Sequence, residues 1–255
     1  MELSEFVDRL DAELRTADYA DLDASANGLQ VGPDEGTVEH VAVAVDGVLE
    51  TFEAAIEADA DALVVHHGLS WGGFDRVTGR TYDRLEPLFS NDLALYVSHL
   101  PLDGHQELGN AAGVADVLEL ENRAPFGELG PEYVGQRGTA VDSYAPAELC
   151  ERLEADLDTG GRPVRVLDFG PDEIEDVAIV TGSGVDWLDE AVDVGADALV
   201  TGEGKGKAYH EAKEAGINVF LAGHYATETF GVRALQDLIE EWDLETTYLD
   251  VPTGL

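Results

Sequence analysis

Cysteine, basic residues and long apolar runs are all scarce in this sequence. Cys150 is the only cysteine among 255 residues, so no disulfide can form within the chain. It lies in the helical pattern of residues 147–157 and is best explained as a small packed side chain. No apolar run approaches the length of a membrane span, and the N-terminus has no basic, apolar leader. We therefore expect a cytoplasmic protein with no membrane partner.

Basic residues are few compared with acidic residues. Lysine and arginine number 14 against 54 aspartates and glutamates, a net charge of −40, and the only lysines are Lys205, Lys207 and Lys213. Apolar residues still recur with strand and helix periods, so the charge indicates a folded protein with an acidic surface rather than disorder. Such a surface suits very high salt and resembles haloarchaeal proteins more than an ordinary acidic protein. The lack of clustered basic residues argues against nucleic-acid partners.

A repeat with an offset of 136 residues is present in the chain. Residues 177–180 align without gaps on residues 41–44, and residues 196–200 align on residues 60–64. Each copy has the pattern of a buried strand, a helix and a second buried strand. This is a βαβ unit, whose two strands should be parallel.

We therefore predict an α/β fold of two similar, duplicated halves, residues 1–122 and 123–255. The second half includes a linking segment, residues 123–172, in which strands over 133–141 and 164–169 flank a helix. This segment contains no pattern that indicates chemistry. We expect it to be scaffold or an oligomer contact.

Histidines gather where the predicted strands end. The apolar strand 63–65 leads directly into His66 and His67, and the strand 93–98 leads into His99. In open α/β sheets, ligands bind beyond the carboxyl ends of the strands. Two adjacent histidines taken alone are more often a strand cap and a solvated loop residue. Here four of the seven histidines lie at strand ends, which favours a shared site.

The pattern His-x-x-x-acid follows the third predicted strand in each half. In the first half, Pro101 is predicted to keep the segment from His99 to Asp103 out of a helix. In the second half, a helix is predicted just after His224, with Glu228 inside it. We expect His224 to take the place in the second half that His99 takes in the first. Taken alone, this pair fits equally well a histidine before a helix and an acid favoured by the helix dipole.

Six side chains are therefore candidate metal ligands. Imidazole and carboxylate suit zinc, iron, manganese, nickel or cobalt, and the lack of thiolates excludes a cysteine-type structural zinc site. Six ligands exceed the need of one tetrahedral ion, whereas two ions about 3.5–4 Å apart, bridged by a carboxylate or water, fit the count. We predict two divalent metal ions per chain in a cleft between the halves. The candidates are His66, His67, His99, Asp103, His224 and Glu228.

Several segments together carry a resemblance to a known family. They are Asn27–Gly32, Val65–Gly68, His99–Asp103, Thr201–Glu203 with His210, and Gly223–Glu228. With them the chain resembles, over nearly its whole length, the NIF-three-like dinuclear-metal proteins, or GTP cyclohydrolase 1 type 2 homologues. The resemblance implies a duplicated α/β fold, two metals between the halves and a toroidal homohexamer. It supports His66, His67, Asp103, His224 and Glu228 as ligands, with His99 beside them and Glu228 as a bridge.

The sequence departs from the family at three places. Gly68 stands where many members have proline, and residues 100–101 replace a more polar pair. Residues 204–206 change the approach to His210. The ligands survive these changes, whereas substrate contacts are not carried over from the family.

We predict a metal-dependent hydrolase that acts on a nucleotide or a similar heterocyclic phosphate. Trp71 and Phe74 follow the histidine pair, placed where a flat ring could stack, and His210 is a third candidate substrate contact. The Gly-rich loop that carries Trp71 is either a lid over the site or a loop that this side chain packs down. No Gly-x-x-x-x-Gly-Lys phosphate loop is present. The alternative is a metal-carrying or regulatory assembly protein without turnover.

Overall fold

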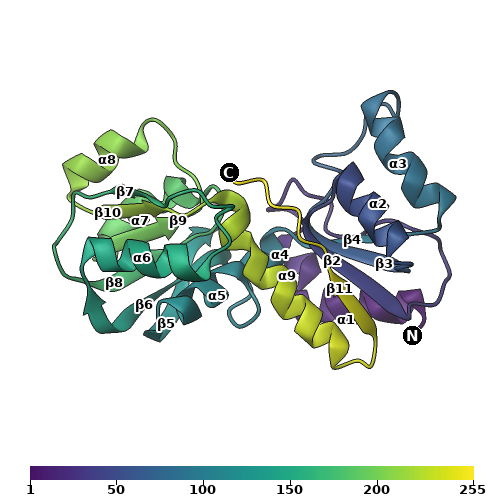
Figure 1. Cartoon of the computed structure of the whole chain (residues 1–255), viewed down its shortest axis with the longest axis horizontal. Coiled ribbons are helices and arrows are strands. Elements are labelled where there is room, and N and C mark those ends of the chain that lie inside the picture. Colours follow the sequence, from purple (N-terminus) through teal and green to yellow (C-terminus); the bar gives the residue numbers. More distant parts are fainter. The chain divides into compact units, whose positions relative to one another are not determined.

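The computed structural model covers residues 1–255, and the chain forms two compact units. Each unit is built on its own β-sheet (Figure 1), so the predicted α/β class is confirmed as a mixed α/β fold with two sheets. The units differ from the contiguous halves 1–122 and 123–255, because the last strand of the chain joins the first sheet. Unit 1 contains Met1–Leu102 and Gly231–Val251, and unit 2 contains Asp103–Phe230 and Pro252–Leu255.

Unit 1 has a five-stranded sheet in the order β1-β4-β3-β2-β11. Strands β11, β2, β3 and β4 run parallel, and β1 is antiparallel to β4. The strands are β1 (Gly28–Val31), β2 (His40–Asp46), β3 (Ala62–His67), β4 (Ala94–Val97) and β11 (Glu245–Tyr248). The helices are α1 (Leu3–Leu14), the 3₁₀ turn η1 (Thr16–Tyr19), α2 (Leu49–Glu57), α3 (Arg80–Ser90) and the start of α4 (Leu100–Asp103).

Unit 2 has a six-stranded sheet in the order β5-β6-β8-β9-β10-β7. The strands are β5 (Leu120–Leu129), β6 (Glu132–Tyr144), β7 (Arg165–Leu167), β8 (Ile174–Ile179), β9 (Ala198–Thr201) and β10 (Asn218–Leu221). The helices are α5 (Asn110–Val117), α6 (Pro146–Asp156), the 3₁₀ turn η2 (Gly184–Trp187), α7 (Leu188–Asp193) and α8 (Ala208–Ala215). Helix α9 (His224–Glu240) begins in unit 2 and ends in unit 1.

The apolar runs predicted to be buried strands form the centre of each unit. In unit 1 the inner strands β2 and β3 are buried on both faces of the sheet. Helices α2 and α3 pack on one of these faces through Phe52, Leu85 and Leu88. In unit 2, α5 and α6 cover one face of the sheet in the same way. Full burial of each large apolar side chain contributes roughly 1.5–3 kcal/mol. None of the helices combines the length and the apolar composition that a membrane crossing requires.

The duplication is visible in the strand order and in individual hydrogen bonds. The order β1-β4-β3-β2 in unit 1 corresponds to β7-β10-β9-β8 in unit 2, each with an antiparallel edge strand. Asp61 Oδ2 accepts two backbone N–H groups at the start of β2, at 2.8 and 3.0 Å. At the offset of 136, Asp197 Oδ2 accepts the two equivalent N–H groups of β8, at 2.9 and 3.0 Å. The two units therefore share a detailed backbone framework.

The third strand of the repeat follows a different offset. Ala62 pairs with Ala94 in unit 1, whereas the equivalent Ala198 pairs with Asn218 in unit 2, which is an offset of 124. The prediction that His224 takes the place of His99 was therefore wrong by one residue. Gly223, which turns the chain there with φ +99°, corresponds to His99, and His224 begins α9 as Leu100 begins α4.

Candidate metal centre

Three histidines of unit 1 meet at the carboxyl ends of two neighbouring parallel strands. His66 and His67 end β3, and His99 follows β4, which pairs with β3 in register. The ring centroids lie 4.6 Å apart for His66 and His67, 5.1 Å for His66 and His99, and 5.7 Å for His67 and His99. One nitrogen from each ring lies within 4.8 Å of the others. The structure thus brings together the three predicted ligands of this unit.

All three rings use Nδ1 in the same way, as a donor to an oxygen. This bond selects the tautomer with the proton on Nδ1 and leaves the lone pair on Nε2. Metal-ligating histidines are held by such bonds, which fix both tautomer and ring orientation. The acceptors are the Ser98 carbonyl for His66 (2.9 Å), Asp46 Oδ1 for His67 (2.8 Å) and Asp23 Oδ1 for His99 (3.0 Å).

Asp23 and Asp46 are site residues that the sequence analysis missed. Burial raises the pKa of the Asp23 carboxyl, but hydrogen bonds from His99, Asn27 and Ser25 and the charge of His99 outweigh it and lower the pKa to about 2. Asp23 is therefore ionised at any ordinary pH. Nothing in the sequence connects it to His99, which lies 76 residues further along the chain.

The Asn27–Gly32 segment, a turn and short strand without a role in the residue pattern, supports the same site. Asn27 Oδ1 accepts the backbone N–H of His99 at 2.8 Å. Gln30 Oε1 accepts the N–H groups of Leu69 and Ser70, at 2.6 and 2.9 Å, and so fixes the loop after the histidine pair. The family resemblance was the signal that marked this segment.

In unit 2, His224 and Glu228 face each other across one turn of α9. His224 Nε2 lies 3.1 Å from Glu228 Oε2, and His224 Nδ1 lies 3.2 Å from Glu203 Oε1. Burial lowers the pKa of His224, but the carboxylates of Glu228 and Glu203 outweigh this and raise it to about 9. Glu203 belongs to the Thr201–Glu203 segment of the family resemblance, and its carboxylate holds Nδ1 of His224 as Asp46 and Asp23 hold the Nδ1 atoms of His67 and His99 in unit 1. All four candidate imidazoles therefore direct Nδ1 to an oxygen.

Two glycines leave the space that Glu228 and His224 fill. A Cβ at Gly182 would lie 2.2 Å from Glu228 Oε1, and a Cβ at Gly202 would lie 2.7 Å from His224 Cα. At the offset of 136, Gly182 corresponds to Asp46. In unit 1, β2 ends in the carboxylate of Asp46 itself. In unit 2, the equivalent position is Gly182, and Glu228 of α9 places a carboxylate there instead.

Asp103 lies in unit 2, close to the same strand end. It accepts hydrogen bonds from Asn110 Nδ2 at 2.9 Å and Thr181 Oγ1 at 3.3 Å, and its ligand oxygen lies within 4.8 Å of that of Glu228. It ends the single helical turn α4. The prediction that Pro101 excludes a helix here was wrong, because proline is tolerated in the first turn, where its missing N–H has no helical partner.

The three candidate substrate contacts differ in their surroundings. Trp71 stands edge-on against His99, with ring centroids 4.9 Å apart, and donates Nε1–H to the Gly68 carbonyl at 3.2 Å. The backbone of its loop is joined to Ser25 by a β-bridge, and the Trp71 residue remains 46% exposed. Phe74 is exposed in the same loop. His210 lies on α8, where its ring contacts Tyr209.

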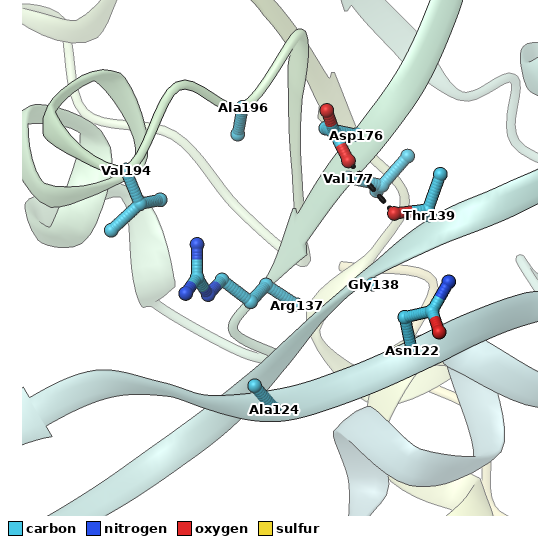
Figure 2. A pocket seen from close by; sticks show the side chains of 9 residues that line it. All are labelled: Asn122, Ala124, Arg137, Gly138, Thr139, Asp176, Val177, Val194 and Ala196. Carbon is cyan, nitrogen blue, oxygen red and sulfur yellow. Dashed lines mark hydrogen bonds between the residues drawn. The ribbon is translucent and has the colours of Figure 1, made fainter.

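Two hollows in the surface lie apart from these residues. One hollow, of about 250 Å³, lies in unit 2. Figure 2 shows its lining, in which Thr139 donates a hydrogen bond to Asp176 and Arg137 extends from β6. Another, of about 480 Å³, lies in unit 1 beside Asp61. Neither of these two hollows is lined by a candidate ligand.

The fold and site define a mixed α/β protein with two sheets and with histidine and carboxylate groups able to hold metal. The sequence model of the family described as Duf34/NIF3 (NGG1p interacting factor 3) matches residues 1–253, and the chain belongs to this family. It is 57% identical to a "GTP cyclohydrolase 1 type 2 homolog" of Halobacterium salinarum, over 100% of both chains.

Solved structures agree with this assignment. The crystal structure of TTHA1606 from Thermus thermophilus is 41% identical, with a TM-score of 0.90 over 100% of both chains. Protein ybgI, described as of unknown function, is 34% identical, with a TM-score of 0.91 over 100% of both chains.

Proposed function

We propose that the chain binds two divalent metal ions and acts as a metal-dependent hydrolase on a nucleotide or a similar heterocyclic phosphate. The observation that carries the proposal is that all four candidate imidazoles are held through Nδ1 by an oxygen, which is how proteins orient metal-ligating histidines. The proposed ligands come from both units, with His99 beside them and Glu228 as the bridge. They are His66, His67, Asp103, His224 and Glu228.

Bound divalent ions supply Lewis-acid chemistry. The chain's own residues then have separate tasks. Buried Glu228 and His66 hold ligand atoms away from bulk water, and Asp46 and Glu203 keep His67 and His224 in one orientation. Trp71 has an exposed ring beside His99 and is proposed to stack on the heterocycle. The name of the curated relatives makes GTP the first nucleotide to test.

The test is elemental analysis of protein purified without chelator and then loaded with zinc, iron, manganese, nickel or cobalt, followed by a nucleotide hydrolysis screen. We expect two ions per chain and release of a hydrolysis product that disappears on metal removal. Trp71→Ala should weaken nucleotide binding and leave the metal content unchanged, whereas His67→Ala should lower the metal content. One ion or fewer in fully loaded protein would contradict the dinuclear site.

The alternative is a metal-carrying or regulatory assembly protein. It becomes the better explanation if loaded protein transfers its metal to an acceptor but hydrolyses no nucleotide with any of the five metals. We also propose that the protein is cytoplasmic and, from the family resemblance, that it is a homohexamer. Light scattering coupled to size exclusion in high salt should give six times the chain mass of 27.3 kDa.

A further inference from the structure

Asp23 is the most completely enclosed carboxylate among the groups that hold the candidate ligands. Its side chain is 2% exposed, against 23% for Asp46 and 52% for Glu203. Four hydrogen-bond donors converge on its two oxygens. They are the backbone N–H groups of Ser25 (2.9 Å) and Leu100 (3.0 Å), Asn27 Nδ2 (2.8 Å) and His99 Nδ1 (3.0 and 3.1 Å).

These contacts determine which nitrogen of His99 carries the proton. A backbone N–H and an amide NH₂ can only donate, so Asp23 must act as an acceptor towards all of them. Nδ1 of neutral His99 must then donate as well, and its lone pair is on Nε2. Asn27 fixes the same residue a second way, because its Oδ1 accepts the backbone N–H of His99 at 2.8 Å. Backbone and ring of His99 are thus held by one short segment.

We propose that Asp23 is a positioning residue, which selects the Nδ1–H tautomer of His99 and directs its Nε2 towards His66 and His67. The proposal rests on the proposed metal-binding function and adds a residue that neither the motifs nor the ligand set contains. It also gives the Asn27–Gly32 segment a chemical task, because Asn27 keeps Asp23 and His99 in register.

The variant Asp23→Asn tests whether position 23 selects the His99 tautomer or needs only some polar side chain. An amide has one acceptor oxygen, so its NH₂ must face two of the four donors, either Leu100 N–H with Asn27 Nδ2 or Ser25 N–H with His99 Nδ1. The His99 ring is the partner that can adapt, by moving its proton to Nε2. The matched control is Asp61→Asn, which also replaces a carboxylate that accepts two backbone N–H groups in unit 1.

The first measurement is ¹⁵N NMR of the histidine side chains in metal-free protein above about pH 8, where an ordinary histidine is neutral. We expect His99 as the Nδ1–H tautomer in the wild type and in Asp61→Asn, and a shift towards Nε2–H in Asp23→Asn. His99→Gln identifies the signal. An Nε2–H tautomer in the wild type overturns the proposal, and this result does not depend on whether Asp23→Asn folds.

The second measurement is metal affinity by chelator competition, together with the visible spectrum of cobalt-loaded protein. Asp23→Asn should bind metal about 10–100-fold more weakly and change the cobalt spectrum, while Asp61→Asn changes neither. Equal affinity and an identical spectrum in Asp23→Asn and wild type would overturn the proposal. If no variant and no wild-type protein binds metal, the proposed function fails, and the NMR result still decides the role of Asp23.

Discussion

Gly182 shows how one missing side chain shapes the candidate site. Its φ is +56°, and a Cβ there would lie 2.2 Å from Glu228 Oε1. In the repeat this position is Asp46 in unit 1, so the two strand ends carry different side chains on the same backbone framework. Gly182 therefore combines a backbone that favours glycine with a space that Glu228 requires.

Gly182→Ala is expected to lose metal as well as stability. Alanine at positive φ costs about 1 kcal/mol, and the added methyl group must also displace Glu228. Gly195→Ala is the matched control, because φ is +79° there and a Cβ meets nothing within 4 Å. Thermal melts should show a similar backbone cost in both variants, and elemental analysis should show metal loss only in Gly182→Ala. Full metal content in Gly182→Ala would contradict Glu228 as a ligand.

His224 makes a pH-dependent prediction. Its pKa is raised from 6.5 to about 9 in the metal-free unit, because the carboxylates of Glu228 and Glu203 outweigh its burial. The pairing therefore stabilises the fold fully below pH 6.5, and this contribution is lost as the pH rises through about 9. A metal ion on Nε2 must replace that proton, so affinity should rise by about tenfold per pH unit from pH 7 towards 9.

Calorimetry in buffers of different ionisation enthalpy measures this exchange. Metal binding near pH 7 should release close to one proton on account of His224. Metal binding to the His224→Gln variant should release about one proton fewer than metal binding to the wild type. Equal proton release in the variant and the wild type would show that His224 gives up no proton to the metal.

At the scale of secondary structure, the sequence predicts the inner strands and the edge strand β7 but not every edge strand. The inner strands β2, β3 and β9 are continuous apolar runs, which is typical of parallel strands covered on both faces. The edge strands β5 and β11 were not predicted, because they are partly exposed and alternate irregularly. The pairing of β11 with β2 joins residues about 200 positions apart, which no local pattern encodes.

The same limit applies to the candidate site. Its histidines were predictable, because each lies at the end of an apolar strand or the start of a helix. Their carboxylate partners Asp23, Asp46 and Glu203 were not, because the contacts follow from strand order and turns. The offset of the third strand was also missed, since the connection is shorter in unit 2 and an ungapped alignment does not detect such a change.

At the scale of the whole molecule, acidic residues far outnumber the bases available to pair with them. Several bases already form ion pairs, among them Arg9 with Glu5, Arg15 with Asp18 and Arg123 with Asp116. With 54 acidic and 14 basic residues, at least 40 carboxylates have no basic residue of their own. Exposed pairs of this kind contribute little to stability. Repulsion among the remaining carboxylates is therefore the main electrostatic term for the folded chain.

Salt should accordingly stabilise this protein. The Debye length falls from about 10 Å at 0.1 M to about 3 Å at 1 M, so carboxylates spread over the surface cease to repel one another. We expect the melting temperature to rise steadily with potassium chloride, and any oligomer to loosen in dilute buffer. Potassium chloride is preferred to a sulfate salt, because sulfate also strengthens apolar burial by exclusion from the surface. A melting temperature and particle size that stay constant from dilute buffer to molar salt would show that the charge of −40 is not an adaptation to salt.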